Sequence, residues 1–397
     1  MPLPLAGITV VSLEHAIAAP FATRQLADLG ARVIKVERPV VGDFARDYDA
    51  RVCGMASHFV WVNRGKESVT LDLKQPAAIE VLMRLVAKAD VLVQNLAPGA
   101  AARMGLSAEA LRPAHPELIV CDISGYGADG PYRDKKAYDL LIQSEAGFLS
   151  VTGTRDEPVK AGCSIADIAA GMYAYSSILA ALYARQNSGP SGGQGAHIDV
   201  SMLESLVEWM GYPMYYAFEG ASPPPRSGAA HATIYPYGPF SAGDGKTVML
   251  GLQNEREWAA FCDKVLRAPQ LAGDARFASN AERHIHRDAL EKIILEVFAA
   301  MRAEEIVARL DAAQIANARV NEMDDVWSHP QLAARERWRE VDTPVGAIRA
   351  ALPPASNDGF EYRMGAVPAL GAHTDAVLAE LGFGTEEIVA LHAAQAV

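Results

Sequence analysis

Short apolar segments alternate with longer helical segments through the first third of the chain, and this alternation limits the possible folds. The segments with strand character are residues 8–13, 31–36, 91–94 and 118–123, and those with helical spacing include 20–30 and 76–88. Such a rhythm is typical of a parallel sheet with helices on both faces. We therefore predict an α/β fold with a Rossmann-like parallel sheet in a large domain.

The turn after the first predicted strand lacks the glycines of a dinucleotide site. The sequence there reads LEHAIAAPFATRQLADLG, without the GxGxxG pattern that lets a backbone approach a pyrophosphate closely. A dinucleotide cofactor is therefore disfavoured.

The charge distribution excludes nucleic acid as a partner. The 397-residue chain carries a net charge of −12, and no basic stripe with interleaved aromatic residues is present. Its first 136 residues are nearly neutral, with 16 Lys and Arg against 15 Asp and Glu. The cations in this part that could hold a phosphorylated cofactor include Lys35, Arg38, Arg64, Lys66, Lys74, Arg103, Lys135 and Lys136.

Cysteine spacing and hydropathy predict a cytoplasmic protein. The four cysteines, Cys53, Cys121, Cys163 and Cys262, are scattered without zinc-site intervals, so we expect reduced and buried thiols. The N-terminus shows no signal-peptide pattern. Residues 168–184 carry no charge, but they are too few to span a bilayer and contain Tyr and Ser, which favours a buried helix.

A smaller second domain is predicted beyond a Pro- and Gly-rich segment. Residues 219–230 contain EGASPPPRSGA and have the composition of a linker. A strand is expected at 247–252 and helices up to about residue 313, and helical spacing returns near 370–381. The loop at 187–195 (NSGPSGGQG) is expected to be rich in turns.

Asp167, in the run SIADIAAG, is the leading candidate for a nucleophile. It lies at the start of the uncharged segment, where the first turn of a helix stabilises a carboxylate. An aspartate with a reference pKa near 3.9 is ionised at neutral pH and needs no adjacent base to attack a carbonyl carbon. The alternative is that Asp167 only caps the helix, because Asp is among the best N-cap residues.

Several segments, in order, resemble the class III CoA-transferases, whose relatives include formyl-CoA transferases and α-methylacyl-CoA racemases. The resemblance covers nearly the whole chain and is specific because many motifs occur in the right order. The motifs are LAGITVVSLEHAIAAPFATRQLADLGARVIKVERP, GD at 42–43, NRGKESVTLDLK, NLAPGAAARMGL, SGYGADGPY, KKAYDLLIQSEAG, SIADIAAGMYA, GQGAHIDVSMLES, IYPYGPF and LGAHTDAVLAELG. By this resemblance Asp167 falls on the catalytic aspartate of the family.

The resemblance also implies the assembly and the domain boundaries. In this family the N- and C-terminal parts form one large domain, a small α+β domain is inserted between them, and two chains interlock. We accordingly expect a homodimer whose large domain is formed by 1–218 and 319–397. Residues 219–230 would be the linker and 231–318 the small domain.

CoA or acyl-CoA is implied as a substrate, with small carboxylic acids as the other partners. No tightly bound cofactor and no metal is expected, and no membrane partner. By resemblance, His15, Ala16 and Ile17 approach the thioester or the pantetheine. Arg38, Lys74, Arg103 and Lys136 would lie near the nucleotide and its phosphates, while Tyr138 would pack on the adenine or another ring. Without the resemblance, His15 could be a core histidine and Lys136 a solvated charge.

Tyr138 separates the transferase from the racemase branch. The racemases have a His at this position, paired with the following aspartate as acid and base, whereas here Tyr138 precedes Asp139. A tyrosine with a reference pKa near 10 costs about 4 kcal/mol to deprotonate at pH 7, so it is a poor general base. Tyr138 therefore favours the transferase.

Two other protein classes fit the sequence less well. A non-catalytic CoA-binding or assembly subunit would be expected to lack the nucleophile, but Asp167 is present. A hydrolase is disfavoured because the sequence GPSGG around Ser191 is not a GxSxG elbow.

The substrate is predicted to be a short dicarboxylic acid. Formyl-CoA transferases carry a run of glycines that the corresponding stretch 226–241 lacks, which argues against oxalate and formyl-CoA. Arg46 or Arg64 could bind a distal carboxylate bidentately, although each could instead form a structural ion pair with Asp43, Asp47 or Asp49. The expected donor is succinyl-CoA or another C4 to C6 dicarboxyl-CoA, and the expected acceptors are itaconate, mesaconate, citramalate, malate or glutarate.

Overall fold

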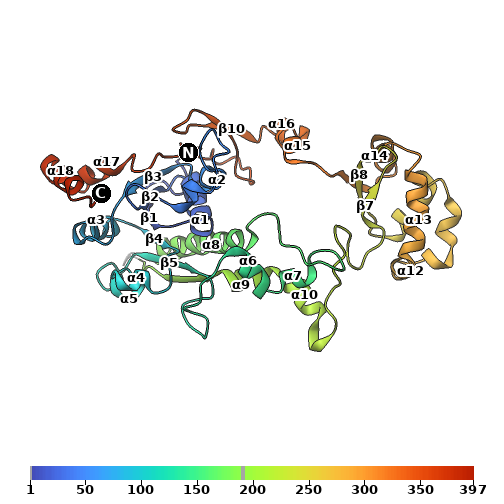
Figure 1. Cartoon of the computed structure of the whole chain (residues 1–397), viewed down its shortest axis with the longest axis horizontal. Coiled ribbons are helices and arrows are strands. Elements are labelled where there is room, and N and C mark those ends of the chain that lie inside the picture. Colours follow the sequence, from blue (N-terminus) through green and yellow to red (C-terminus); the bar gives the residue numbers. More distant parts are fainter. Residues whose placement is uncertain (1, 189–192) are drawn as a thin grey trace. The chain divides into compact units, whose positions relative to one another are not determined.

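Six parallel strands form the sheet of the first of two units in the computed structural model, which describes residues 2–188 and 193–397 (Figure 1). The strand order is β3-β2-β1-β4-β5-β6, and every neighbouring pair is parallel. The strands are β1 (Thr9–Leu13), β2 (Arg32–Glu37), β3 (Lys66–Thr70), β4 (Val91–Gln94), β5 (Ile119–Ser124) and β6 (His197–Ser201). This confirms the predicted α/β fold with a parallel sheet. The order reverses between β1 and β4, and α/β proteins bind ligands at such a switch point, beyond the carboxyl ends of the strands.

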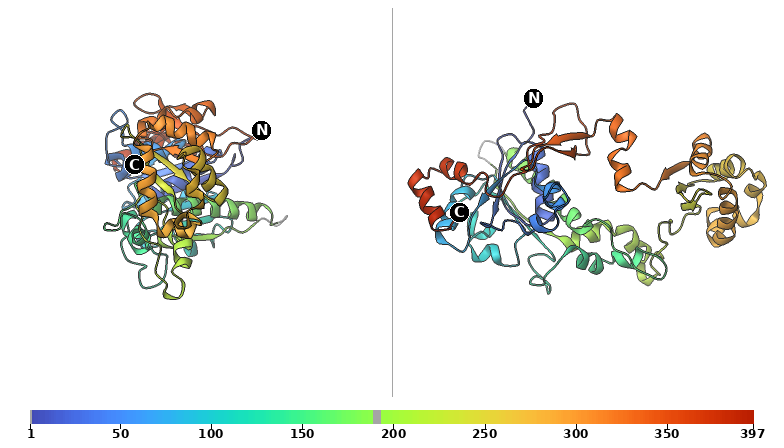
Figure 2. Two further views of the ribbon diagram at one scale, coloured as in Figure 1. Left: turned by 90° about the vertical axis from the view of Figure 1, so that its right-hand side faces the viewer. Right: turned by 45° about the horizontal axis from the view of Figure 1, so that its top comes forward.

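Helices cover both faces of this sheet (Figures 1 and 2). The helices of the first unit are α1 (Ala18–Asp28), the 3₁₀ helix η1 (Phe44–Asp47), α2 (Ser57–Asn63), α3 (Pro76–Val86), α4 (Ala100–Arg103), α5 (Ala108–Leu111), α6 (Asp139–Glu145), α8 (Ile165–Gln186), α9 (Met202–Trp209), α17 (Thr374–Glu380) and α18 (Thr385–Ala393). The unit also contains an antiparallel pair, β10 (Trp338–Val341) and β11 (Ile348–Ala351).

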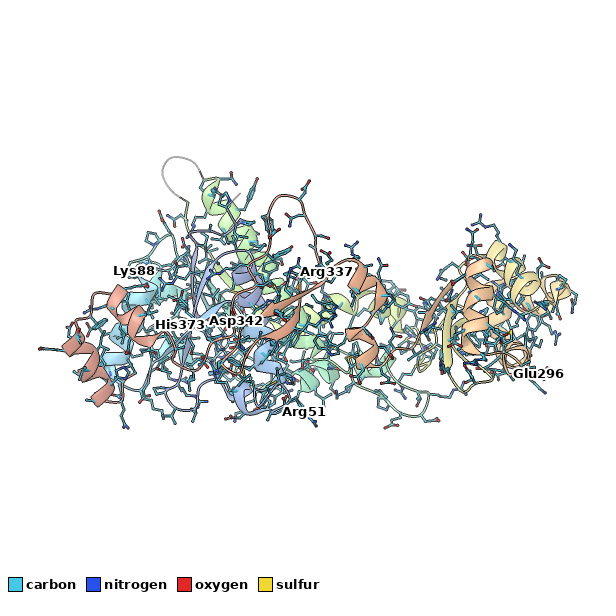
Figure 3. The ribbon with its side chains drawn as sticks, turned by 90° about the horizontal axis from the view of Figure 1, so that it is seen from above. Arg51, Lys88, Glu296, Arg337, Asp342 and His373 are labelled. Atoms are coloured by element: carbon cyan, nitrogen blue, oxygen red, sulfur yellow. The ribbon has the colours of Figure 1, made fainter. Side chains whose placement is uncertain are left out.

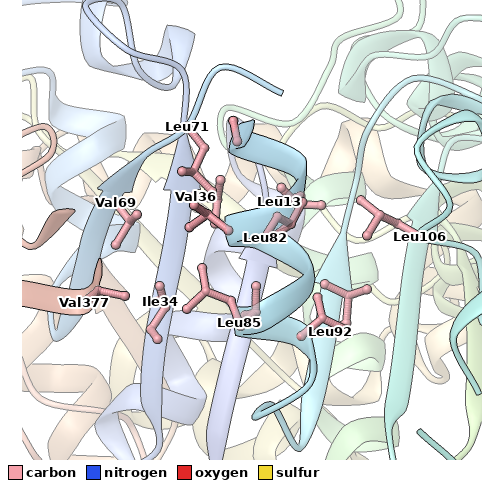
Figure 4. Packing of buried hydrophobic residues seen from close by; sticks show 14 of the residues in the cluster. Leu13, Ile34, Val36, Val69, Leu71, Leu82, Leu85, Leu92, Leu106 and Val377 are labelled. Atoms are coloured by element: carbon pink, nitrogen blue, oxygen red, sulfur yellow. The ribbon is translucent and has the colours of Figure 1, made fainter. Parts of the chain in front are cut away.

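An apolar layer joins α3 to one face of the sheet (Figure 4). α3 begins with Pro76, whose fixed φ suits the first helical position. It buries Val81, Leu82 and Leu85 against Leu13 of β1 and neighbouring strand residues. Complete burial of one such side chain contributes about 1.5–3 kcal/mol, so this layer fixes the strands that carry the site.

The central helix of the opposite face is α8, which packs against α1, α9, β5 and β6. Its 22 residues are long and apolar enough to cross a membrane by length and composition alone. However, its small side chains Ala166, Ala169, Ala170 and Ala174 are buried inside the first unit. α8 therefore packs one face into the sheet domain, whereas the sequence predicted a buried helix and most of its residues are not fully buried.

The late LGAHTDAVL segment closes the free edge of β3. The Ser68 hydroxyl accepts a hydrogen bond from the Gly371 N–H (2.9 Å), and the Ser68 N–H donates to Nδ1 of His373 (3.1 Å), which is labelled in Figure 3. The Thr70 N–H donates to the hydroxyl of Thr374 (3.0 Å). These contacts satisfy backbone groups that an open edge strand would expose.

The second unit has its own antiparallel sheet and apolar core. Its strands are β7 (Tyr237–Ser241), β8 (Thr247–Gly251) and β9 (Ala316–Arg319), and its helices are α7 (Phe148–Val151), α10 (Gly211–Tyr216), η2 (Phe218–Gly220), α11 (Glu255–Ala260), η3 (Phe261–Val265), η4 (Pro269–Gly273), η5 (Ala275–Phe277), α12 (Asn280–Ile285), α13 (Arg287–Phe298), α14 (Ala303–Ala312) and α15 (Met323–Trp327). α16 (Pro330–Ala334) lies where the chain passes between the units. Trp258, Phe261, Phe277 and Phe298 fill the core.

The two units do not follow the boundaries expected from the sequence. The second unit contains residues 148–160 and 211–331, and the first contains the rest. The predicted linker 219–230 thus belongs to the second unit, because it is bound to the 148–160 segment. The Gly228 N–H donates to the Gly153 carbonyl (2.7 Å), and Nε of Arg226 donates to the Thr154 carbonyl (2.9 Å).

Two more predictions concern the four cysteines and the turn-rich loop at 187–195. Cys121 and Cys262 are buried thiols, but Cys53 and Cys163 are exposed, so the prediction of four buried cysteines was wrong for these two. Cys53 lies in a turn and Cys163 in a bend, and both are outside the apolar core. Part of the turn-rich loop predicted at 187–195, including Ser191, lies outside the described residues.

Candidate active site

Asp167 lies in the first turn of α8 but does not cap that helix. α8 begins at Ile165, and the residue at its N-cap position is Ser164. The Asp167 carboxylate instead lies near the backbone N–H of Ala18, the first residue of α1, which acts to lower its pKa. The N-cap alternative is therefore wrong, and Asp167 faces the amino end of a second helix.

The cap of α8 comes from Asp139, at the start of α6. One carboxylate oxygen of Asp139 accepts from the N–H groups of Ala166 (2.8 Å) and Asp167 (3.4 Å). The other oxygen accepts from Nε2 of the buried Gln143 (2.7 Å). Asp139 thus fixes the first turn of α8 and leaves the Asp167 side chain free of a capping role.

The environment of Asp167 raises its pKa to about 7. Burial is the main cause, followed by the negative charge of Asp139, while the Ala18 N–H acts in the opposite direction. The expectation of a fully ionised carboxylate at neutral pH was therefore wrong for the substrate-free chain. A reference pKa holds for a solvated group, and this carboxylate is largely removed from water. A less solvated carboxylate is also a stronger nucleophile once it has lost its proton.

Gly171 lets α1 approach α8 closely beside Asp167. A side-chain Cβ at Gly171 would lie 2.7 Å from the Ala18 carbonyl oxygen and 3.0 Å from Cδ1 of Phe21. Residues four apart share one face of a helix, so Gly171 and Asp167 meet α1 in successive turns. The small residue at 171 therefore sets the distance between Asp167 and Ala18.

His15, Ala16 and Ile17 follow β1 at the switch point of the sheet. The Asn95 side chain, after β4, accepts from the His15 N–H and donates to the His15 carbonyl, both at 2.9 Å. Ala16 has φ +59°, in the left-handed region that favours glycine. Ile17 then occupies the N-cap position of α1. The structure thus brings these three predicted residues next to Asp167 through Ala18.

Buried charges lie beneath this turn. Nζ of Lys35 donates to Asp43 (2.8 Å) and lies 3.4 Å from Glu14, while Nζ of Lys66 donates to Glu14 (2.6 Å). All four side chains are almost inaccessible to solvent. Burial lowers the pKa of Lys66 to about 7, with a further decrease from the charge of Lys35. For Lys35 the charges of Glu14 and Asp43 outweigh burial and raise the pKa.

An aromatic cluster stands beside the same turn. The His15 ring stacks on Phe44 with 5.2 Å between centroids, Phe44 contacts Tyr48, and Tyr48 meets His58 edge to face. Burial, then the negative charges of Asp43 and Asp167, raises the pKa of the Tyr48 phenol, which places this group close to both carboxylates. Tyr138 also acts on Tyr48, and its own side chain is 70% exposed.

Four cations predicted to bind phosphate lie beyond the carboxyl ends of the strands. Arg38 directly follows β2, Lys74 follows β3, Arg103 ends α4 after β4, and Lys136 lies between β5 and α6. All four side chains are exposed, and none forms an ion pair with any residue that the structure describes. Exposed and unpaired cations at this edge are suited to a phosphorylated ligand.

Arg46 and Arg64, by contrast, are both occupied by carboxylates. Arg46 binds Glu37 through two nitrogens (2.8 and 2.7 Å) and stacks over Phe59 at 3.7 Å. Arg64 binds Asp28 in the same bidentate manner (2.9 and 2.8 Å) and is buried. The prediction that one of them reads a substrate carboxylate is therefore wrong, because neither guanidinium fork is open.

Comparison with known proteins gives the family. The model of CoA-transferase family III matches residues 5–374. The chain belongs to this family. Human succinyl-CoA:glutarate CoA-transferase is 32% identical over 95% of this chain and 86% of its own length. The succinate–glutarate CoA-transferase of Agrobacterium fabrum is 34% identical over 95% of this chain and 96% of its own. A CAIB/BAIF family protein from Brucella suis has a similar crystal structure, with TM-score 0.84, 33% identity, and coverage of 96% of this chain and 100% of that one.

Sequence reasoning missed several residues of this CoA-transferase site. Asp139 was considered only as the partner of a racemase histidine, and its capping of α8 could not be read from residues 27 positions apart. Asp43 and Asn95 act on the 15–17 turn from 27 and 80 residues away. The quoted motifs did contain all three, so the only available signal was that polar residues occurred within otherwise apolar family blocks.

Proposed function

We propose that this family III CoA-transferase moves CoA between short dicarboxylic acids through a covalent intermediate on Asp167. The observation that carries the proposal is the placement of Asp167, with its carboxylate beside the amino end of α1 and its own helix capped by another residue. A carboxylate with a pKa of about 7 is half ionised at neutral pH and can serve as a nucleophile without an adjacent base.

The reaction would proceed by four acyl exchanges. A carboxylate oxygen of Asp167 attacks the thioester carbon of the donor, the C–S bond breaks, and the CoA thiolate leaves with the electron pair. The thiolate then attacks the Asp167 acyl carbon of the mixed anhydride and expels the donor acid. The acceptor carboxylate attacks the resulting aspartyl-CoA thioester and releases the thiolate again. Attack of the thiolate on the acceptor carbonyl gives the new acyl-CoA and restores Asp167.

Backbone N–H groups at the start of α1 would stabilise the tetrahedral intermediates. The Ala18 N–H contacts Asp167, Pro20 has no N–H, and the Ile17 and Ala19 N–H groups have no partner among the described residues. Such unpaired donors near a reacting carbonyl bind the developing oxyanion, and one donor is often worth about 3 kcal/mol.

CoA would lie along the carboxyl edge of the sheet. Its thioester would meet His15, Ala16 and Ile17 at the switch point, and its phosphates would meet Arg38, Lys74, Arg103 and Lys136. Support comes from the exposure of these four cations and from the lack of ion pairs to them within the described chain. The exposed ring of Tyr138 would pack against the adenine or another ring.

The dicarboxylate specificity rests on the relatives. The similar human and Agrobacterium enzymes carry succinate and glutarate in their names. We infer succinyl-CoA or a related dicarboxyl-CoA as donor and a C4 to C6 dicarboxylate such as glutarate as acceptor. Because Arg46 and Arg64 are already bound to carboxylates of the chain, other groups would bind the distal carboxylate of the substrate.

The proposed assembly is an interlocked homodimer, with the second unit as the inserted domain of each chain. In the first unit Met172, Tyr183 and Trp209 expose large apolar surfaces, and in the second unit Tyr212 and Tyr215 do so. Contiguous exposed apolar residues mark interaction surfaces. Light scattering across a dilution series should report a constant dimer mass, whereas a stable, active monomer would contradict the assembly. A cytoplasmic location stays a prediction.

The function is tested by Asp167→Ala in a CoA-transfer assay. We expect at least a thousandfold loss of transfer while CoA binding and the folded structure persist. Turnover near that of the unsubstituted enzyme would refute the nucleophile assignment.

Incubation in deuterated water separates the transferase from the racemases. The transferase should not exchange the substrate α-proton, while rapid exchange would assign the chain to the racemases despite Tyr138.

Acceptor choice is tested separately by comparing succinate with butyrate, which differ in one terminal carboxylate. A site that binds the distal carboxylate should turn over succinate at least tenfold faster than butyrate. Butyrate would leave the polar groups of that site buried without a partner, which is costly. Equal rates would remove the dicarboxylate part of the proposal and leave the transferase intact.

A further inference from the structure

Asp43 is completely buried and is held by contacts that a packing role does not require. Its Oδ2 accepts from Nζ of Lys35 (2.8 Å), and its Oδ1 accepts from the N–H groups of Ala45 (2.9 Å) and Ala16 (3.2 Å). Nδ1 of His15 lies 3.8 Å from the same Oδ1. Removing a carboxylate and an ammonium from water is expensive, and an apolar residue of similar size often gives equal stability. The contacts of Asp43 therefore call for another explanation.

Ala16 has a backbone conformation that an L-residue avoids. Its φ of +59° lies in the left-handed region, which costs a residue with a Cβ about 1–2 kcal/mol unless its surroundings hold it there. Two side chains do so. Asn95 binds both polar groups of the His15 backbone, and Asp43 binds the Ala16 N–H.

The held conformation determines where α1 begins. Ile17 follows Ala16 as the N-cap residue, and Ala18 then packs against α8 at Gly171, one turn after Asp167, where its N–H acts to lower the pKa of the Asp167 carboxylate. If Ala16 relaxed to a negative φ, the chain would leave β1 in another direction and the amino end of α1 would move. The unpaired N–H groups of Ile17 and Ala19 would move with it.

We propose that Asp43 is a positioning residue, which holds Ala16 in the left-handed conformation and thereby aims the amino end of α1 at Asp167. Lys35 keeps the Asp43 carboxylate ionised and oriented, and Asn95 holds the adjoining peptide. This inference rests on the proposed role of Asp167 as the nucleophile, because the effect of Asp43 on catalysis passes through the Ala18 N–H and its neighbours.

Asp43→Asn is the first test, because it keeps the size of the side chain but has only one acceptor oxygen, which cannot accept from both Lys35 and the backbone N–H groups of Ala16 and Ala45. The readout is the rate at which acyl-CoA plus hydroxylamine converts Asp167 to its hydroxamate, per mole of folded enzyme, as a function of pH. We expect a roughly 10- to 100-fold slower reaction, as for a misplacement of about 1 Å. We also expect the acid limb of the profile to move up, because the Ala18 N–H that lowers the pKa of Asp167 would move away from the carboxylate.

The direction of the pH shift separates positioning from simple electrostatics. Asp139 and Tyr48 are the other titratable groups that interact with Asp167, and neither is changed. Removing the negative charge of Asp43 would by itself make Asp167 easier to ionise and move the acid limb down. An upward shift therefore requires that the Ala18 N–H has moved.

Two further variants keep the test valid if Asp43→Asn folds poorly. Ala16→Val leaves every buried charge in place but puts a β-branched residue at φ +59°, and it should give the same slower reaction and upward shift. Asp28→Asn is the control: it removes an equally buried carboxylate that binds Arg64 and Arg24 in the last turn of α1, far from residue 16. It should lower stability without moving the acid limb.

The possible outcomes separate the two proposals. Absence of a hydroxamate on Asp167 in the unsubstituted enzyme overturns the proposed function and this inference together. A normal hydroxamate there, with unchanged rates and acid limbs in both Asp43→Asn and Ala16→Val, overturns this inference alone. A shift of the same size in Asp28→Asn also overturns it, because any buried charge would then have the effect.

Discussion

The two units of the chain bury different kinds of residue. The first encloses Glu14, Lys35, Lys66 and Asp43 beneath the turn that leads to the nucleophile. In the second, the described core is apolar and aromatic, and Arg283 is its one fully buried charge. An apolar core stabilises a fold without a desolvation penalty, whereas each buried charge has a desolvation penalty of several kcal/mol before it is paired. The difference indicates that these four charges beneath the turn serve the geometry of the site.

The largest expected effect comes from removing one charge or one core ring. Lys35→Met leaves Asp43 and Glu14 without their shared cation and should cost about 3–5 kcal/mol of unfolding free energy at pH 7. Phe298→Ala in the second unit should cost a similar 3–5 kcal/mol by opening a cavity. Denaturant unfolding of both variants measures these losses.

Their pH dependence distinguishes the two variants. Without Lys35, the folded-state pKa of Asp43 rises above its unfolded value, so its ionised form is the unstable one, while Glu14 keeps its ion pair with Lys66. The loss in Lys35→Met should therefore be greatest above pH 7 and should shrink as the pH falls toward 4. The loss in Phe298→Ala should not change over this range. Equal pH dependence in both variants would contradict the comparison.

A smaller effect is expected at the helix contact beside Asp167. Gly171→Ala places a Cβ 2.7 Å from the Ala18 carbonyl and should cost about 2–3 kcal/mol, because α1 must move away from α8. Transfer activity should fall at least tenfold. Gly211→Ala, at the start of α10 in the second unit, is the matched control, since its Cβ would meet nothing within 4 Å. It should change stability by no more than about 0.5–1 kcal/mol and leave activity intact.

The smallest effect is a gain in stability. The folded pKa of Asp167, about 7, is above its unfolded value, so this group favours folding at low pH and loses that contribution as the pH rises through 7. Asp167→Asn removes the titration and should raise the unfolding free energy by about 1–2 kcal/mol at pH 8 and by less at pH 5. Denaturant titrations at the two pH values measure the unfolding free energy. An Asp167→Asn variant that is less stable than the unsubstituted enzyme at pH 8 would show that burial does not destabilise the ionised carboxylate.

The sequence allowed the strands β1, β2, β4 and β5 of the first unit to be predicted, because each is a short apolar run between helical segments. It also allowed Asp167 to be found, but only through the family motifs, since by itself an Asp at a helix start is most simply a cap. The true cap, Asp139, lies 28 residues earlier, and only the folded chain brings the two together.

The errors share one physical cause, which is that the partner of a charge is set by tertiary structure. Arg46 and Arg64 were placed near a substrate because their partners Glu37 and Asp28 lie 9 and 36 residues away in sequence. The ionisation of Asp167 was misjudged for the same reason, since burial cannot be read from the residue type. Arg38 and Arg103 are exposed, as phosphate-binding residues would need to be, and their role at the phosphates stays a prediction.

Trapping of Asp167 tests the central claim most directly. The unsubstituted enzyme would be incubated with succinyl-CoA and hydroxylamine and its peptides analysed by mass spectrometry, with Asp139→Asn as a variant that keeps the nucleophile. We predict a hydroxamate on Asp167 that depends on acyl-CoA and inactivates the enzyme in parallel with its formation. Asp139→Asn should still form the hydroxamate at Asp167. Inactivation without modification of Asp167, or a hydroxamate on another carboxylate, would contradict the account.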